Sequence, residues 1–153
     1  MPDLSIRPTL GPVEYPSLVA IWRRAVDATH DFLDDADRDE IEARLPGDYF
    51  PAVALSVAER DGRPVGFSGV HGDSLEMLFV DAEERGGGIG SALLAHAVEQ
   101  QGVTRVDVNE QNGPAADFYA RRGFEVVGRS ERDDAGRPYP LLHLSLDRTT
   151  ARR

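Results

Sequence analysis

Four glycines occupy five consecutive positions in residues 86–90, within the stretch ERGGGIGS (residues 84–91). The stretch runs directly into ALLAHAVEQQ (residues 92–101), whose apolar spacing predicts a helix. Glycine lets a backbone approach a ligand closely, and the first amides of a helix are free to donate to an anion. The stretch therefore predicts an anion-binding loop, and the type of anion remains to be decided.

Two common phosphate-binding loops do not fit this stretch. A Walker A loop needs a lysine on the terminal phosphates, and the sequence contains no lysine. A dinucleotide-binding loop needs the pattern Gly-x-Gly-x-x-Gly, but the third glycine is replaced by Ser91 in one frame and by Leu93 in the other. A nucleotide-binding kinase is therefore disfavoured.

Hydrophobic periodicity predicts the elements that position the loop. Helical spacing is found in residues 13–30, 34–45 and 89–98, and residues 114–122 form a short helical pattern. Strand patterns occupy residues 4–10, 53–57, 64–70, 75–80, 106–108, 124–128 and 139–146. The order is strand, two helices, three strands, helix, strand, helix and two strands. It predicts an α/β (α+β) fold in which helices pack against a mixed sheet.

The stretch LFVDAEERGGGIGSALL (residues 78–94) resembles the acyl-CoA loop of the GNAT superfamily of N-acetyltransferases. That loop carries Arg or Gln, two variable residues, Gly, one variable residue, and Gly or Ala, between a strand and a helix. Arg85, Gly88 and Gly90 occupy those places, and successive amides there can wrap a pyrophosphate. The resemblance implies that coenzyme A is bound by the whole loop, namely Arg85, Gly86, Gly87, Gly88, Ile89, Gly90 and Ser91.

A second stretch, NEQNGPAADFYARRGF (residues 109–124), resembles the later motif of the same family. Its matching positions imply that Asn112, Ala115 and Phe118 also bind the cofactor, although Asn112 before Gly-Pro equally suits a turn or helix cap. The element order matches the GNAT fold over nearly the whole chain. The resemblance implies one domain, residues 1–153, with a mixed, mostly antiparallel sheet of about six to seven strands flanked by about four helices.

In this family the amine attacks the thioester directly in a ternary complex, so the absence of cysteine is compatible with it. The strand before the loop separates from its neighbour in the family, which leaves main-chain amides for the developing oxyanion and the pantetheine arm. Leu78, Phe79 and Val80 match that strand, although they also suit an ordinary core. Tyr119 matches the general acid, because a neutral phenol can protonate a departing thiolate.

The group that accepts the amine proton is less well defined by the sequence. Glu76 interrupts an otherwise apolar strand, and a buried carboxylate there is a candidate base, although Glu76 equally suits a solvent-facing position at the strand start. His30 and Asp31 lie in the stretch THDFL, where the family builds its acceptor site, so the resemblance implies that they bind the substrate. A lone histidine equally suits a structural role, and a water chain to solvent is the alternative to all three side chains as proton acceptor. Residues 26–33, VDATHDFL, and residues 133–144, DDAGRPYPLLHL, resemble a bacterial subgroup of the family.

Composition restricts the partners. The 153 residues include 27 acidic residues and 17 basic ones, all arginine, which gives a formal net charge of −10. This charge disfavours nucleic acid and anionic membranes and favours a cationic acceptor, although a solvated acidic surface explains it without any acceptor. No apolar run is long enough to span a bilayer, no signal-peptide pattern is present, and no ligand spacing suggests a metal.

The sequence thus predicts a cytoplasmic N-acetyltransferase that transfers an acetyl group from acetyl-CoA, without a metal, to a small-molecule or peptide primary amine. A homodimer is compatible with this hypothesis. The alternative is a noncatalytic acyl-CoA-binding sensor or scaffold, and the match of Tyr119 to the general acid favours the enzyme.

Overall fold

The computed structural model describes residues 4–84 and 86–146. Its elements follow the order expected from the sequence. The α-helices are α1 (Tyr15–Thr29), α2 (Asp35–Arg44), α3 (Ile89–Gln101) and α4 (Gly113–Ala120). The strands are β1 (Leu4–Pro8), β2 (Ala54–Arg60), β3 (Arg63–His71), β4 (Ser74–Val80), β5 (Arg105–Asn109), β6 (Phe124–Ser130) and β7 (Leu141–Leu146).

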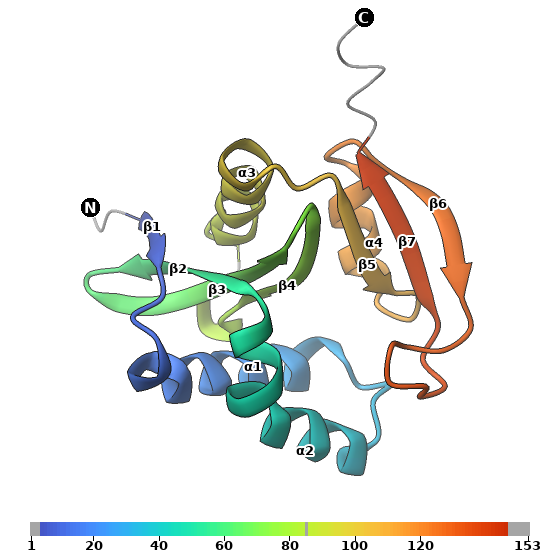
Figure 1. Ribbon diagram of the computed structural model, residues 1–153, viewed down its shortest axis with the longest axis horizontal. Helices are drawn as coiled ribbons and strands as arrows, with labels where there is room; N and C mark the ends of the chain where they lie inside the picture. Colours follow the sequence, from blue (N-terminus) through green and yellow to red (C-terminus); the bar gives the residue numbers. More distant parts are fainter. Residues whose placement is uncertain (1–3, 85, 147–153) are drawn as a thin grey trace, which may run out of the picture.

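The strands form one seven-stranded sheet in the order β1-β2-β3-β4-β5-β7-β6. Among the described strands, β4 and β5 pair in parallel and all other neighbours pair antiparallel. The prediction of a mixed, mostly antiparallel sheet with flanking helices is therefore confirmed. In Figure 1, α3 lies across the strands from α1 and α2.

Successive side chains of the central strands point to opposite faces of the sheet, and different helices cover the two faces. On one face, Val57 of β2 and Phe67 of β3 pack with Trp22 of α1. On the other face, Ala58 of β2 packs with Leu93 of α3. A third cluster joins α3 and α4 to β5 and β7. The junction between β4 and β5 is thereby flanked by α1 on one side and by α3 and α4 on the other.

β4 and β5 separate after two paired positions. Ser74 pairs with Arg105 and Leu75 with Val106, and no further pair joins the two strands in the described part of the chain. The separation that the family resemblance implied is thus present. The apolar run of β4 predicts burial on both faces except at Glu76, and this is wrong: residues 77–80 are half-buried because they border the resulting gap.

The chain stays coiled beyond the predicted end of α2. Pro46 and Gly47 predict the end of a helix, and α2 does end at Arg44. A wide turn (Leu45–Tyr49) and a 3₁₀ turn (Phe50–Ala52) nevertheless follow directly. Leu45 and Phe50 are buried in the cluster on the α1 face. Tertiary packing of these two side chains therefore continues the coil past the proline.

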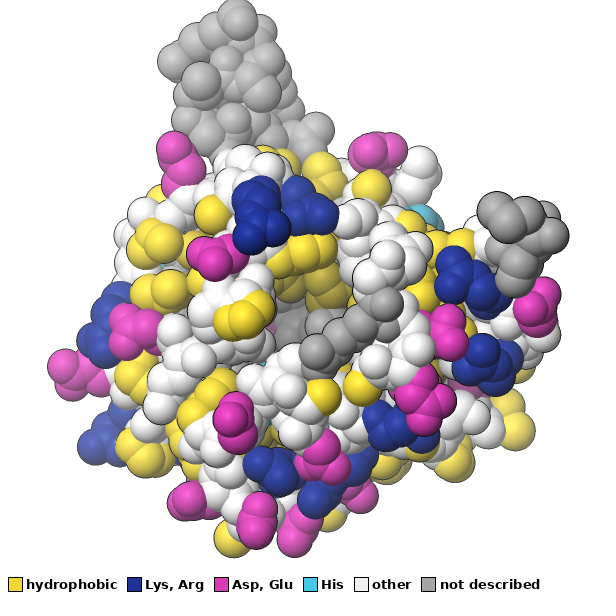
Figure 2. Space-filling model, turned by 180° about the vertical axis from the view of Figure 1, so that it is seen from behind, with side chains coloured by type: hydrophobic (Ala, Val, Ile, Leu, Met, Phe, Trp, Pro, Cys, Tyr) yellow, Lys and Arg dark blue, Asp and Glu magenta, His cyan; other side chains and the backbone are white. Residues whose placement is uncertain are grey.

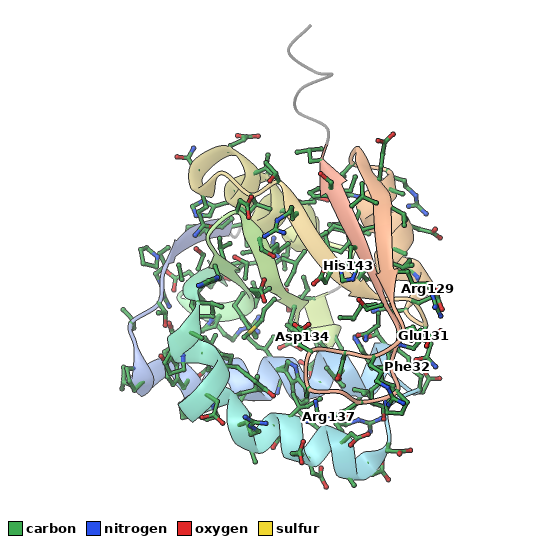
Figure 3. The ribbon with its side chains drawn as sticks, turned by 45° about the vertical axis from the view of Figure 1, so that its right-hand side comes forward. Phe32, Arg129, Glu131, Asp134, Arg137 and His143 are labelled. Atoms are coloured by element: carbon green, nitrogen blue, oxygen red, sulfur yellow. The ribbon has the colours of Figure 1, made fainter. Side chains whose placement is uncertain are left out.

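The loop between β6 and β7 (residues 131–140) is held against α2. The Tyr139 hydroxyl donates to Asp37 Oδ2 at 2.5 Å and accepts from the Asp34 amide at 3.1 Å. Arg137 forms an ion pair with Asp37. Figure 3 shows the loop crossing toward α1 and α2, with Asp134 and Arg137 on it. These contacts bring the second hairpin next to the N-terminal helices.

An ion pair between a half-exposed arginine and a buried carboxylate joins α1 to the turn after β4. Asp81 is only 2% exposed and accepts from Arg24 Nε at 3.0 Å and Nη2 at 2.7 Å. We expect Arg24→Ala to lower the free energy of unfolding by about 1.5–3 kcal/mol, the range for a hydrogen bond to a charged group, because it leaves the buried carboxylate with the Glu83 amide as its partner. Arg44→Ala is the control, since its partner Asp48 is exposed; it should cost at most about 0.5 kcal/mol. Urea unfolding of both variants measures the difference, and equal losses would contradict it.

Candidate active site

The glycine-rich loop presents free amides at the start of α3. Gly88 caps the helix with φ 77°, in the left-handed region that favours glycine. The first helical hydrogen bond comes from the Ala92 amide to the Gly88 carbonyl. The amides of Gly90 and Ser91 donate to no acceptor within the described residues. Geometrically this is an anion-binding helix start. Arg85, the predicted first residue of the motif, lies outside the described residues.

A cavity of about 300 Å³ opens between β4, α1 and α4, and we call it the α4-side cavity. Seven residues predicted to bind the acyl donor border it, namely Leu78, Phe79, Val80, Gly90, Asn112, Ala115 and Phe118. The predicted acid Tyr119 also borders it, together with Ala25, Thr29, His30 and Pro114. Gly86, Gly87, Gly88 and Ser91 flank Gly90 in the loop and the first turn of α3, but they are not among the residues that line the cavity. Ile89 is 1% exposed and packs in the core. Figure 2 shows the molecule from behind, where the surface is hollowed and hydrophobic side chains line the hollow.

Gly90 lies both at the start of α3, where the free amides are, and at the border of the α4-side cavity. A Cβ added at Gly90 would lie 3.6 Å from the Phe118 ring and 3.7 Å from Val80. Both neighbours border the cavity, so a side chain larger than alanine at Gly90 would extend toward it. A polyanionic end at the loop and an apolar arm along β4 therefore fit these residues.

Asn112 and Arg122 complete the rim near α4. Asn112 caps α4, with its Oδ1 accepting from the Ala115 amide at 3.3 Å, and it also borders the cavity. Both sequence interpretations of Asn112 thus agree with its position. Sequence reasoning missed Arg122, whose guanidinium lies 3.8 Å over the Phe118 ring and donates to Ser91 Oγ at 2.5 Å. The adjacent arginines in FYARRGF were the available signal.

Tyr119 is buried between Phe118 and Phe124, with edge-on ring contacts to both. Its hydroxyl makes no hydrogen bond within the described part of the chain. The hydroxyl is also not among the polar atoms there that are both fully buried and without a partner, so it retains some solvent exposure. The hydroxyl therefore reaches the cavities that Tyr119 borders. Burial raises the pKa of Tyr119 well above its usual value. The phenol stays protonated at neutral pH and is available as a donor.

The gap between β4 and β5 holds a smaller cavity of about 140 Å³, which we call the wedge cavity. Glu76, Asn109 and Tyr119 are among its lining residues. Glu76 occupies a β-bulge, because Leu75 pairs with Val70 and Met77 with Gly69, leaving Glu76 without a partner in β3. Of the two interpretations of Glu76, the solvent-facing one agrees with the structure, since the side chain is exposed.

A third cavity, of about 310 Å³, lies on the other side of the gap, and we call it the α1-side cavity. Aromatic and aliphatic side chains of α1, β4 and the turn after α2 form much of its wall, including Trp22, Val26, Tyr49 and Phe79. An adjoining opening of about 280 Å³ is bordered by the carboxylates of Glu76, Asp107, Asp133 and Asp134 and by Arg137. The cavity thus combines an apolar wall with a predominantly acidic entrance.

His30 and Asp31, the two residues predicted to bind substrate, occupy different environments. His30 follows α1 and borders all three cavities. Asp31 is exposed and is not among the residues that line them. Burial, reinforced by the charge of Arg38, lowers the pKa of His30 to about 4. The imidazole is therefore neutral at physiological pH.

The lowered pKa of His30 gives a pH-dependent stability. Between about pH 6.5 and pH 4 the unfolded chain binds a proton on His30 that the folded chain does not bind, so stability falls as the pH falls through this window. We expect wild type to lose up to about 3 kcal/mol more than His30→Gln between pH 7 and pH 4. Urea unfolding at several pH values measures this difference. Parallel curves for the two proteins would contradict a neutral, buried His30.

A series of side-chain hydrogen bonds links β6, β7 and β5. Ser130 Oγ lies 2.6 Å from His143 Nε2, and His143 Nδ1 lies 2.7 Å from Asp107 Oδ1. The order matches a nucleophilic triad, but Ser130 is not among the residues that line the neighbouring cavity. We therefore assign these contacts to holding three strands together.

In residues 4–84 and 86–146, no helix is long and apolar enough to cross a membrane, and no His/Asp/Glu cluster could hold a metal ion.

Known proteins are similar to this chain in sequence and in fold. Residues 51–126 match the family model described as acetyltransferase (GNAT) domain. The chain is 50% identical over 132 residues to the peptidyl-lysine N-acetyltransferase YjaB of Salmonella typhimurium, covering 86% of this chain and 90% of that protein. The solution structure of apo-form YjaB from Escherichia coli is similar with a TM-score of 0.86 at 44% identity, covering 95% of this chain and 98% of that one.

A more distant structure has the same fold. It is the paia N-acetyltransferase from Thermoplasma acidophilum in complex with coenzyme A, with a TM-score of 0.71 at 18% identity, covering 92% of this chain and 98% of that one. At this identity the likeness concerns the fold alone. The family model and the YjaB relatives carry the assignment: this chain belongs to the GNAT superfamily and is an N-acetyltransferase that uses acetyl-CoA as its acyl donor.

Proposed function

We propose that this enzyme acetylates the Nε amine of lysine side chains in peptides or proteins. In this proposal acetyl-CoA lies along the α4-side cavity, and the lysine side chain enters through the α1-side cavity. The observation that carries the proposal is that His30 and Phe79 border both cavities at the gap between β4 and β5. A thioester and an amine that enter from opposite sides would meet there. The names of the YjaB relatives support peptidyl lysine as the acceptor.

In this proposal acetyl-CoA is bound mainly by main-chain groups. The free amides of Gly90 and Ser91, at the positive end of the α3 dipole, would hold the pyrophosphate. Arg122 beside Ser91 would add a positive charge. The unpaired edge of β4, at Leu78, Phe79 and Val80, would bind the pantetheine arm as an added strand binds a sheet edge.

In the proposed reaction the amine nitrogen attacks the thioester carbonyl carbon directly. A main-chain amide on the open edge of β4 would stabilise the oxyanion that forms. The carbon–sulfur bond then breaks, and the Tyr119 hydroxyl donates its proton to the departing thiolate. Support for this role comes from the open position of the hydroxyl. The raised pKa of Tyr119 means that the phenol is protonated at neutral pH and therefore has a proton to give.

The shape and charge of the acceptor side favour a lysine in a peptide. The stem of a lysine is apolar and its head is cationic, which matches an apolar wall with an acidic entrance. A released-CoA assay with paired peptides tests the proposal. One peptide carries a single lysine and a blocked N-terminus, and the other has no lysine and a free N-terminus. We expect turnover with the first; turnover with the second alone would overturn lysine as the acceptor.

The acidic entrance predicts a preference for basic sequence around the target lysine. Asp134 is exposed, and its side chain makes no hydrogen bond within the described residues, so Asp134→Asn removes charge without breaking a contact. We expect this variant to raise KM about two- to fivefold for peptides with flanking arginine, since an exposed ion pair contributes about 0.2–1 kcal/mol. Glu99→Gln, on the exposed side of α3, serves as the charge-matched control. Equal KM values for both variants would contradict the preference.

A further inference from the structure

His30 sits where the two proposed substrates would meet. It follows the last residue of α1, and its ring lies 5.1 Å from that of Phe32 and 6.5 Å from that of Phe79, measured between centroids. It borders the α1-side, α4-side and wedge cavities. Phe79 shares this position but has no polar atom. Within the described residues, His30 is thus the polar side chain common to all three cavities.

The hydrogen bonds of Thr29 fix the tautomer of His30. Thr29 Oγ1 lies 2.8 Å from the Ala25 carbonyl oxygen and 2.6 Å from His30 Nδ1. A hydroxyl has one proton, and a carbonyl can only accept, so that proton goes to Ala25. His30 Nδ1 must then be the donor to Thr29 Oγ1. In the neutral imidazole this leaves Nε2 without a proton and with a free lone pair.

The free nitrogen is accessible. His30 Nε2 makes no hydrogen bond within the described residues. It is also not among the polar atoms there that are both buried from solvent and without a hydrogen-bond partner, so it is exposed to the cavities. The charges of Arg38 and Asp31 act on this ring. The titratable side chains that share a cavity with it are Tyr49, Glu76, Asp107, Tyr119, Asp133 and Tyr139. Arg38 and burial both oppose protonation, which keeps the lone pair free at neutral pH.

We infer that His30 Nε2 accepts the proton from the attacking amine, in place of the exposed Glu76. This rests on the proposed lysine acetylation. The neutral amine forms a bond from nitrogen to the thioester carbon, and one N–H proton of the adduct passes to Nε2. That proton is far more acidic than one on free lysine, so a weakly basic imidazole can take it. Tyr119 gives its proton to the sulfur, and the imidazolium then returns one to the phenolate through the wedge cavity, so the protons balance.

Matched substitutions separate proton transfer from hydrogen bonding. His30→Asn keeps a donor near Thr29 and removes Nε2, whereas His30→Gln provides an amide that can accept a hydrogen bond but not a proton. We expect both to lower kcat for a lysine peptide about 10²-fold or more, with the Kd for acetyl-CoA and the KM for the peptide little changed. If His30→Gln keeps wild-type kcat, or if Glu76→Gln lowers kcat more than His30→Gln does, the inference is overturned.

Chemical rescue adds a readout that a structural role would not move. In His30→Ala, added imidazole should restore turnover in a saturable way, in proportion to its unprotonated fraction. Absence of rescue in a variant that binds acetyl-CoA like wild type would overturn the inference. Wild type that turns over no lysine peptide would instead refute the proposed function, so the two failures are distinguishable.

Discussion

Replacing Tyr119 with phenylalanine is expected to lower kcat about 10²- to 10⁴-fold, the range for loss of a general acid, while the Kd for acetyl-CoA stays nearly unchanged. The hydroxyl makes no hydrogen bond within the described residues, so its removal breaks no contact there. The ring packing against Phe118 and Phe124 is preserved. The free energy of unfolding should therefore change by less than about 1 kcal/mol. Steady-state kinetics, calorimetric titration and urea unfolding measure the three quantities.

A distant tyrosine provides the control for this substitution. Tyr15 packs edge-on against Phe50 in the cluster on the α1 face, outside the three cavities. Tyr15→Phe should leave kcat at the wild-type value. Because the pKa of Tyr119 is raised, its ionisation should also not lower wild-type kcat between pH 7 and 9. A Tyr119→Phe enzyme with wild-type kcat would remove Tyr119 as the acid.

The second large effect is expected for a larger side chain at Gly90, which should weaken the binding of acetyl-CoA without lowering the free energy of unfolding of the ligand-free protein. A Cβ there faces Phe118 and Val80 at ordinary contact distances, so a leucine would extend into the α4-side cavity. We expect Gly90→Leu to raise the Kd for acetyl-CoA about tenfold or more, which corresponds to about 1.4 kcal/mol. The ligand-free protein should be equally or more stable, since glycine is less favourable in a helix than leucine by up to about 1 kcal/mol.

The control for Gly90 lies on the same helix. Ala95 is on the exposed side of α3, so Ala95→Leu adds the same bulk away from the cavity and should leave the Kd nearly unchanged. Gly90→Ala should give a smaller loss of affinity than Gly90→Leu and keeps the test usable if the larger side chain disturbs folding. Unchanged binding in Gly90→Leu would show that acetyl-CoA does not pass this residue.

The sequence predicted the order and type of elements because the local periodicity of this chain agrees with its tertiary packing. Alternation around Val57 and Ala58, for example, assigns adjacent residues to opposite faces of the sheet. The extension of the coil past Pro46 was missed because it depends on where Leu45 and Phe50 are buried. Exposure along β4 was also missed, since an apolar run does not reveal that the neighbouring strand diverges.

The candidate site was predictable where backbone chemistry demands particular residues. The glycine loop is an example, because Gly88 adopts a left-handed φ that favours glycine and lies at the helix start where the free amides are. Arg122 and the central position of His30 depend on contacts between elements far apart in the chain, which no local pattern encodes. The solvent-facing bulge at Glu76 likewise follows from the register between β3 and β4.

The binding position of acetyl-CoA is tested most directly by titrating it into ¹⁵N-labelled protein and following the backbone amide signals. The expected result is that the largest shifts map to residues 86–91 at the start of α3, to residues 78–80 of β4 and to residues around Tyr119. Shifts confined to the edge strand β6 or to the exposed side of α2, with the α3 start unaffected, would contradict this account of the donor site.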